Sequence, residues 1–568
     1  MAKGLFYLIF SCLALGWVTE SVGQSSFLRH GSPSENLVER YEIRTGNLRN
    51  DLFTDIRPFK REAVGQFTQS LDTFDIYYSD VDRYNLSYLE ADNLPWSGGD
   101  LDGVESPLWG QFYQSRANLF QVNEDGFDLF VNPGLYLEAG PSELNDNLLY
   151  TNTRSAEIRG SIDDKVGFYS YISENQIRPP QHEMDFRDST RSYPGAHFTK
   201  SFGEDAVDFF GARGYITFSP TNSISMRFGH GNNFIGSGER SLLLSDEAPD
   251  YTFLQINTQI WRFNYQNIFT RLIDRGGIFH GVDPGDPYPP KYAAIHYLSL
   301  DILDNLNVGL FESVTFHDNQ NRGRGFDVHY ANPIIFYRSI EHQIGDPDKM
   351  MVGLNMRYLP VNDVEIYGQL MLNEFRLDDL LAMEGHNANK YGTQIGAKYL
   401  DALNISNLDL QLEFNRVRPY SYSHYEISRD YPVNTWSHYG QALAHPLGAN
   451  FYEWIGKVEY QPTPKINTGL RLTHAAYGDD TSGSHWGRDI FRSYRDNEQE
   501  LGNEVAQGAL TQLDIAEGWV SYELWHNLFL EVNAKYRRLD SEKEGLSNDN
   551  WFIGTTLRLN EPRRGWDF

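Results

Sequence analysis

Cysteine, long apolar runs and basic residues are all scarce in this sequence. The 568 residues include one cysteine, Cys12, and no stretch beyond the first two dozen residues holds the ~18 consecutive apolar residues that a membrane-spanning helix needs. An intrachain disulfide and a bundle of membrane helices are therefore excluded. Lysine and arginine number 48 against 77 aspartate and glutamate, so the formal net charge is -29 and binding to a nucleic-acid backbone is disfavoured.

Motifs that carry catalysis or hold a cofactor are also missing. The sequence contains no Cys-x-x-Cys or His-Glu-x-x-His motif and no spacing that brings a nucleophile and a base together. The glycine-rich segment 229–238 lacks the lysine and the strand-to-helix setting of a phosphate-binding loop. We therefore expect no enzyme activity and no cofactor, while a divalent-metal site on the acidic residues stays an open question.

Residues 1–23 have the composition of a secretory signal. Lys3 precedes an apolar run over residues 5–18 and small residues end it, so we expect cleavage before Gln24. Cys12 lies too early in the run for a lipid anchor. The chain is therefore expected to be exported, and the mature chain to contain no cysteine.

Strict alternation of apolar and polar residues recurs throughout the chain after residue 126. In the clearest segment the two sets are Leu408, Leu410, Leu412 and Phe414 against Asp409, Gln411, Glu413 and Asn415. Residues 364–373 and 528–537 repeat the pattern. Successive side chains of a strand point to opposite faces, so each segment has one apolar and one polar face. A soluble antiparallel sheet has the same period, and alternation alone does not distinguish it from a membrane barrel.

Short turns and long loops divide this region in a regular order. The predicted short turns are 163–165, 219–223, a tight turn near Thr258, 304–305, 360–363, 404–406, 462–464 and 525–527. The long connections are 177–210, 231–250, 271–292, 318–349, 375–391, 418–451 and 477–514. Short turns on one side and long loops on the other are typical of outer-membrane barrels.

The count of these hairpins predicts the fold class. Eight hairpins, an opening strand at 127–139 and a closing strand at 551–559 give an all-β membrane barrel of about 18 antiparallel strands, range 16–18. We assign the barrel to residues 123–568 and place it in the cell outer membrane, with the short turns in the periplasm and the long loops outside.

Residues 24–122 lack the alternation and show helical spacing instead. One apolar stripe follows Pro58, which we place as the first residue of a helix: Val64, Phe67, Leu71 and Phe74. A second helix is expected after Ser79, whose side chain suits an N-cap. We therefore expect a small helical periplasmic element that covers one mouth of the barrel.

Several segments near the predicted loops are dense in aromatic residues, His, Arg and Asn. They are RFGHGNNFIGSGERS (227–241), NPIIFYRSIEHQIGDP (332–347), RPYSYSHY (418–425) and HPLGANFYEW (445–454), with FYQSRANLF (112–120) and Val131-Asn132-Pro133 nearer the N-terminus. From about residue 110 to its end, the chain resembles the RemB-like gliding-motility outer-membrane proteins of the Bacteroidota, within the Wzi-type capsule assembly protein family. The resemblance implies an eighteen-stranded barrel with a periplasmic helical element, and a role in retaining surface polysaccharide or in gliding motility.

The candidate site residues come from these segments. They are Arg227, His230, Asn232, Arg240, Arg338, Glu341, His342, Arg418, Tyr420, Tyr422, His424, Tyr425 and His445. Glycan binding needs flat aromatic faces and planar amide, carboxylate or guanidinium groups, which this set supplies. The same residues suit a polar network that holds loops inside the lumen, and both interpretations stay open. No third ligand or nucleophile is placed by spacing beside Glu341 and His342.

The functional expectation is a non-enzymatic outer-membrane barrel in surface-polysaccharide (capsule) assembly or attachment, or in gliding motility, with glycan bound by external loops. Its expected partners are outer-membrane lipid, surface polysaccharide, and proteins of a motility or secretion machinery, with no nucleic acid. The alternatives are a porin-like diffusion channel, a structural component of a surface assembly, and a hydrolase. Loops folded into the lumen would argue against an open channel.

Overall fold

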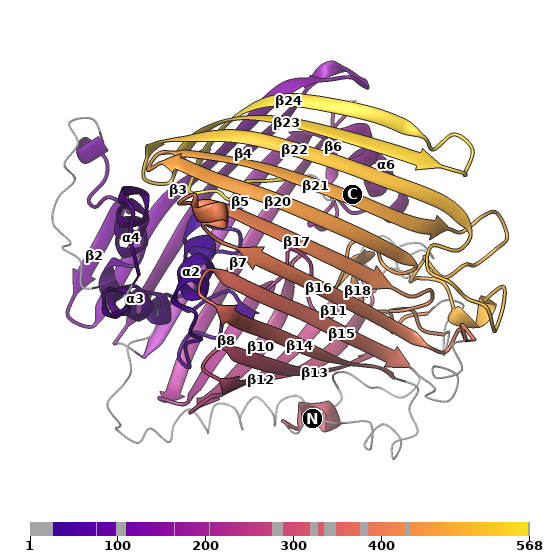
Figure 1. Ribbon diagram of the computed structural model, residues 1–568, viewed down its shortest axis with the longest axis horizontal. Coiled ribbons are helices and arrows are strands. Elements are labelled where there is room, and N and C mark those ends of the chain that lie inside the picture. Colours follow the sequence, from indigo (N-terminus) through magenta and orange to yellow (C-terminus); the bar gives the residue numbers. More distant parts are fainter. Residues whose placement is uncertain are drawn as a thin grey trace.

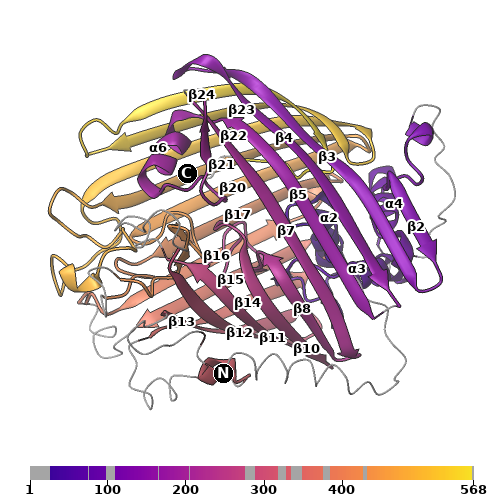
Figure 2. The ribbon, with the colours of Figure 1, turned by 180° about the vertical axis from the view of Figure 1, so that it is seen from behind.

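The strands of the chain close into one antiparallel barrel, and a helical element lies at one end of it (Figure 1). The computed structural model describes residues 26–74, 76–97, 109–163, 165–203, 205–274, 288–317, 326, 328–333, 348–374, 384–425 and 432–565. Figure 2 shows the barrel from behind, with the N-terminal helices at the end where the short turns lie.

Eighteen strands form the barrel wall, which confirms the fold class and the upper end of the predicted range. They are β3 (Phe127–Ser142), β4 (Asn145–Ile162), β5 (Val166–Arg178), β7 (Ala206–Thr221), β8 (Ile224–Gly231), β10 (Tyr251–Ile260), β11 (Phe263–Ile273), β12 (Pro290–Leu303), β13 (Leu306–His317), β14 (Lys349–Val361), β15 (Val364–Glu374), β16 (Lys390–Tyr399), β17 (Leu408–Val417), β20 (Phe451–Thr463), β21 (Ile466–Asp479), β22 (Ala509–Trp525), β23 (Leu528–Ser541) and β24 (Asn548–Leu559). Each pairs antiparallel with the next, and β24 pairs with β3 to close the barrel.

The remaining short strands and helices are not part of the eighteen-stranded wall. Two short strands add to it locally: β2 (Phe120–Glu124) pairs with β3, and β6 (Lys200–Phe202) pairs with β7. The loops hold β9 (Phe234–Ile235), β18 (Ser437–His438), β19 (Gln441–Ala442), α6 (Gln181–Thr190) and the single 3-10 turns η2 (Trp109–Gln111), η3 (Val328–Ala331), η4 (Ala402–Asn404) and η5 (Tyr494–Asp496).

The predicted short turns all join neighbouring strands, with one at a shifted position. Strand β10 runs to Ile260, which pairs with Phe263, so the turn expected near Thr258 falls at 261–262, where Trp261 has a φ of 56°. The long loops do not surround the whole opposite rim. Only residues 143–144 separate β3 from β4, and only 542–547 separate β23 from β24. The rim on either side of the barrel closure therefore carries only short connections.

The barrel wall is apolar outside and polar inside, the reverse of a soluble protein. Leu412 and Val532 are 55% and 54% exposed on the outer face, whereas Glu413 and Glu531 are buried in the lumen. A single strand carries both faces because its side chains alternate. The predicted apolar face of β17 therefore faces lipid, and its polar partners face the lumen.

The N-terminal element contains four helices and one short strand. They are α2 (Pro33–Thr45), β1 (Ile56–Arg57), α3 (Arg61–Ser70) with the 3-10 turn η1 (Leu71–Thr73), α4 (Asp80–Asp92) and α5 (Leu94–Ser97). Val64, Phe67 and Leu71 are fully buried, as the apolar stripe predicts. Ser79 caps α4 in a reciprocal capping box with Asp82. No helix among the described residues is long and apolar enough to cross a membrane.

Two details of this element differ from the prediction. Helix α3 begins at Arg61 with Lys60 as its N-cap, so Pro58 is not the first helical residue; Ile56 and Arg57 before it are extended and pair with β9. Helix α2 was not expected. It buries Val38 and Tyr41 in an apolar cluster, but Glu35, Arg40 and Glu42 are buried as well and interrupt the apolar pattern. Arg40 and Glu42 pair with charged groups of the barrel side and Glu35 with His30, which local periodicity does not reveal.

Ion pairs and hydrogen bonds hold the element against the short-turn end of the barrel. Arg40 of α2 pairs with Asp401 at 2.5 Å, and Arg357 of β14 contacts Glu42. On α4, Asp92 accepts a contact of 2.8 Å from His526 in the turn between β22 and β23. The element therefore covers this mouth of the barrel, as predicted.

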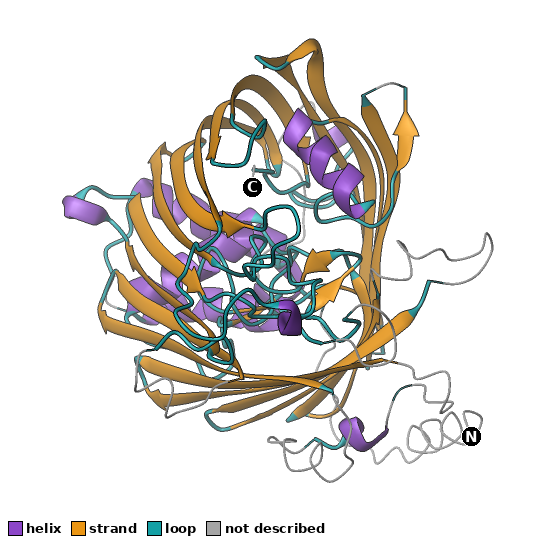
Figure 3. Cartoon of the chain, turned by 90° about the vertical axis from the view of Figure 1, so that its right-hand side faces the viewer, coloured by secondary structure: helices purple, strands orange, loops and turns teal. Residues whose placement is uncertain are grey.

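Two long loops fold into the lumen, as Figure 3 shows by the teal segments within the ring of strands. They are residues 232–250, which contain β9, and residues 432–450, which contain β18 and β19. Leu242, Leu243, Leu244 and Trp436 are at most 1% exposed and belong to one apolar cluster inside the barrel. The lumen of this barrel is filled on that side rather than open.

Candidate functional site

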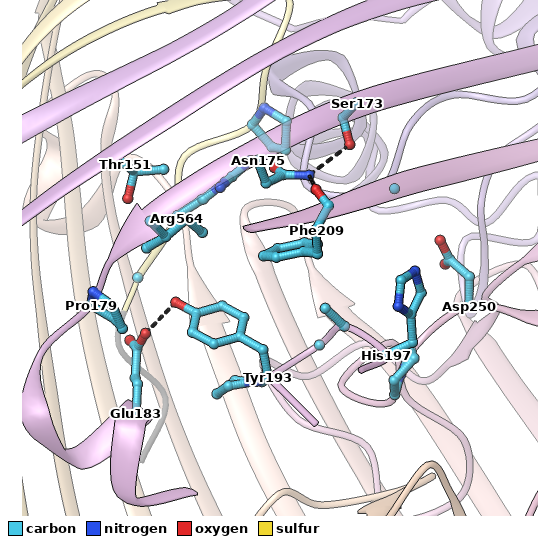
Figure 4. A pocket seen from close by; sticks show the side chains of 18 of the residues that line it. Thr151, Ser173, Asn175, Pro179, Glu183, Tyr193, His197, Phe209, Asp250 and Arg564 are labelled. Atoms are coloured by element: carbon cyan, nitrogen blue, oxygen red, sulfur yellow. Dashed lines mark hydrogen bonds between the residues drawn. The ribbon is translucent and has the colours of Figure 1, made fainter. Parts of the chain in front are cut away.

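A cavity of about 580 Å³ lies in the lumen beside strands β3, β4, β5 and β7 (Figure 4). The segment 179–197, which includes α6, borders it on the loop side, and residues 246–250 border it on the side of the inward loops. The C-terminal segment 562–565 leaves β24 and reaches the same space. Parts of the chain that are far apart in sequence thus build one site.

Two aromatic rings and an amide define the middle of the cavity. The ring centroids of Tyr193 and Phe209 lie 5.6 Å apart at an interplanar angle of 35°. The Asn175 amide donates to the Ser173 hydroxyl at 3.0 Å and to the Phe209 carbonyl at 3.4 Å, which sets the orientation of its side chain. The site thus offers apolar ring faces next to a fixed amide.

The carboxylate of Glu183 orients Tyr193. The phenol donates a hydrogen bond to this carboxylate, which α6 carries into the cavity. Burial, and then the negative charge of Glu183, raise the pKa of Tyr193 well above its ordinary value. The phenol therefore stays protonated, and its ring keeps one position in the site.

Charged groups surround this centre. Arg213 of β7 donates to Asp250 at 2.7 Å, and Lys535 of β23 lies 3.7 Å from Glu138 of β3. The guanidinium of Arg564 lies over the ring of Tyr136 at 4.7 Å and forms no ion pair with any described residue. Arg564 thus presents a cation to the cavity without a carboxylate of its own.

Of the residues singled out from the sequence, His230 lines this cavity. It is exposed and lies 3.4 Å from the Thr252 hydroxyl. Arg227 is buried between the rings of Phe27 and Phe253, and Asn232 donates to the Asp246 carbonyl. Arg240 donates to Glu247 at 2.7 Å.

Another group of these residues makes buried contacts among the long loops and with the barrel wall. Tyr420 donates from its phenol to the His485 carbonyl, and Tyr422 donates to the Leu242 carbonyl, each at 2.8 Å. Arg418 donates to the Asn389 carbonyl, and His445 lies 2.7 Å from Glu453. All four side chains are buried.

His424 and Tyr425 lie farther out and stack at 4.4 Å. Arg495 from the loop between β21 and β22 covers the Tyr425 ring at 3.8 Å. Burial lowers the pKa of His424 to about 3, with Lys349 adding to the effect, so its ring is neutral. Arg338, Glu341 and His342 lie outside the described residues.

The structure therefore separates the candidate residues instead of gathering them into one site. Sequence reasoning missed Asn175, Tyr193, Phe209 and Arg564, which the fold brings together from β5, the following loop, β7 and the C-terminal segment. One signal was available: the polar segment 561–564 after the last strand has no place in a lipid-facing wall.

Comparisons with known proteins support the architecture. No protein-family model matches the chain, and no curated protein matches it. The chain is similar in structure to Wzi of Escherichia coli, an outer-membrane protein involved in group 1 capsule assembly and a carbohydrate-binding β-barrel, with a TM-score of 0.55, 12% identity, and coverage of 96% of this chain and 100% of that one. The outer-membrane protein OprD of Pseudomonas aeruginosa matches with a TM-score of 0.42, 9% identity, and coverage of 76% and 93%. At these identities the similarity to Wzi is one of fold, and it agrees with a closed outer-membrane barrel.

Proposed function

We propose that this chain is a non-enzymatic outer-membrane barrel that binds surface polysaccharide and takes part in capsule assembly or attachment. The observation that carries the proposal is the luminal cavity with Tyr193, Phe209, Asn175 and Arg564. Its volume of about 580 Å³ falls within the range of about 300–1,000 Å³ that small-ligand sites occupy.

The chemistry of the cavity suits a segment of glycan. The rings of Tyr193 and Phe209 offer apolar faces to sugar C–H groups, while the Thr151 hydroxyl offers a donor and an acceptor and the Asn175 amide oxygen an acceptor to sugar hydroxyls. Arg564 adds a cation without an acidic partner among the described residues. Wzi, which has a similar fold, binds carbohydrate, and that agrees with the proposal.

The resemblance to RemB-like proteins extends the proposal to gliding motility. A barrel that holds polysaccharide at the cell surface would link that polymer to proteins of a motility or secretion machinery. A freely open diffusion channel is less well supported, because the inward loops 232–250 and 432–450 occupy the lumen.

Binding of purified surface polysaccharide to the detergent-solubilised full chain tests the proposal. We expect saturable binding that weakens about tenfold in Asn175→Ala or Phe209→Ala, because each loses a contact worth about 1 kcal/mol or more. Arg495→Ala, in the outer loop, is the matched control and should bind like the wild type. Absence of saturable binding, together with normal surface glycan in a deletion strain, would exclude this function.

A further inference from the structure

A second cavity, of about 540 Å³, lies between the N-terminal element and the barrel wall. Helices α2 and α4 line it on one side and strands β16 to β24 on the other, and it reaches Asn407 and Gln461 next to the short turns. The cavity described above reaches Gly195 in the loop after α6, at the opposite rim. Together, the two cavities extend along the barrel from one rim to the other.

Both cavities share part of their lining. The shared residues are His30, Asp246, Glu247, Pro562 and Gly565. They come from three separate segments: the stretch before α2, the inward loop 232–250, and the C-terminal segment after β24. A thin partition of non-wall residues therefore separates the two spaces, and we call it the septum.

We propose that the septum is a gate, and that the two cavities become a continuous conduit for small hydrophilic solutes when the contact between His30 and Asp246 opens. This function is independent of the proposed glycan binding.

The three segments of the septum are held together by noncovalent polar contacts. His30 lies 3.1 Å from Asp246 through Nε2 and 2.8 Å from Glu35 through Nδ1, and its ring stacks on Phe234 with centroids 5.5 Å apart. Arg29 fastens the same stretch to the C-terminal segment by an ion pair of 2.7 Å with Glu561. None of these residues belongs to the barrel strands, so the septum can part while the wall stays intact.

The contact between His30 and Asp246 is stable at neutral pH and can still be broken. Burial opposes the charged imidazole, but the carboxylates of Asp246 and Glu35 raise the pKa of His30 to about 10, so the pair is ionic at neutral pH. The side chains of His30 and Asp246 are 19% and 32% exposed, so water reaches the pair. When the pair separates, water can take the place of each side chain's lost partner. Water cannot replace the apolar contacts of the cluster around Leu243 and Trp436 in this way.

The lining indicates the class of solute. Acidic, basic and neutral amide side chains border the cavity beside the N-terminal element, including Glu39, Lys398, Lys457 and Arg471. A third cavity, of about 420 Å³, lies between α6 and residues 488–492 in the loop after β21, and Glu247 borders it too. A polar route of mixed charge suits hydrated ions and small sugars rather than apolar molecules.

Conductance of the full chain in planar bilayers, in potassium chloride, tests the gate. The wild type should be almost silent, and His30→Ala should raise the open probability by about tenfold or more, because a partly exposed ion pair and its ring are lost. Asp246→Asn keeps the side-chain volume and should act in the same direction. Lys535→Gln removes an ion pair with Glu138 that borders only the upper cavity and should stay silent.

Folding is checked in each variant by its heat-modifiable mobility in gel electrophoresis. If His30→Ala does not fold, Asp246→Asn carries the test. Folded Asp246→Asn protein that is as silent as the wild type overturns the gate, and so does Lys535→Gln protein that opens equally often. Glycan binding by these variants is measured separately, so failure of the gate and failure of the proposed function are told apart.

Discussion

The two ends of this barrel are closed by different chemistry. At the short-turn end, the N-terminal element meets the barrel through ion pairs such as Arg40 with Asp401 and Glu39 with Lys398. From the long-loop end, the inward loops pack apolar residues such as Leu243 and Trp436 into the lumen. Closure by the N-terminal element therefore depends on charge and pH, whereas closure by the inward loops depends on the volume of the packed side chains.

The difference follows from what each segment meets. The lumen wall is polar, so a segment that packs directly against it must carry charges and amides. The two loops meet each other as well as the wall, through Ser245 to the Leu443 carbonyl at 2.8 Å and Trp436 to the Leu243 carbonyl at 3.0 Å. They can therefore enclose an apolar cluster between them.

Truncating the loop cluster should give the largest effect. Trp436→Ala removes a side chain that is 1% exposed and should cost about 3–5 kcal/mol of the stability of the packed loops. Limited proteolysis should then cut within residues 432–450. Trp261→Ala is the matched control, because Trp261 is 71% exposed on a short turn. Equal protease resistance in both variants would show that the cluster does not hold the loops.

Acid should loosen the docking of the N-terminal element and leave the loop cluster in place. Burial raises the pKa of Glu39, but Arg57, Lys398 and Arg357 outweigh it and lower the pKa to about 2. The stabilisation is therefore present above the ordinary value of about 4.5 and is lost as pH falls through about 2.

Glu39→Gln isolates this contribution. It should weaken docking of the N-terminal element at neutral pH and flatten the acid dependence between about pH 4.5 and pH 2. Protease accessibility of residues 26–97 as a function of pH measures it. An unchanged acid profile in Glu39→Gln would mean that other carboxylates control the docking.

The smallest predicted effect concerns one helix within the N-terminal element. Ser79→Ala removes the cap of α4 and should cost about 1 kcal/mol. Ser79→Thr keeps the hydroxyl, which accepts from the Asp82 N–H and donates to its carboxylate, and should lose only a few tenths of a kcal/mol. Chemical denaturation followed by the unfolding of the N-terminal element distinguishes the two, and equal losses would assign no role to the cap.

Much of the barrel could be predicted because its signals are local. Leu412 and Glu413 are consecutive residues of one strand and therefore point to opposite faces. Short turns such as 304–305 lie between segments with that alternating pattern. The cap at Ser79 depends only on residues three apart. Such features need no knowledge of distant parts of the chain.

The site was harder to predict because its contacts are not local. Tyr420 and Tyr422 alternate as if on an exposed strand, yet both have positive φ values and are buried under other loops. Asn175 and Arg564, which share one cavity, lie far apart in the sequence. The glycan-binding and luminal roles of the candidate residues stay predictions.

Composition and a period of two are enough to show an acidic chain whose strands have one apolar face, since neither needs a distant partner. Which loops enter the lumen, which residues share a cavity, and the position of the septum around His30 and Asp246 follow from tertiary contacts. Those features depend on closure of the barrel, which brings the first and last described segments of the chain together.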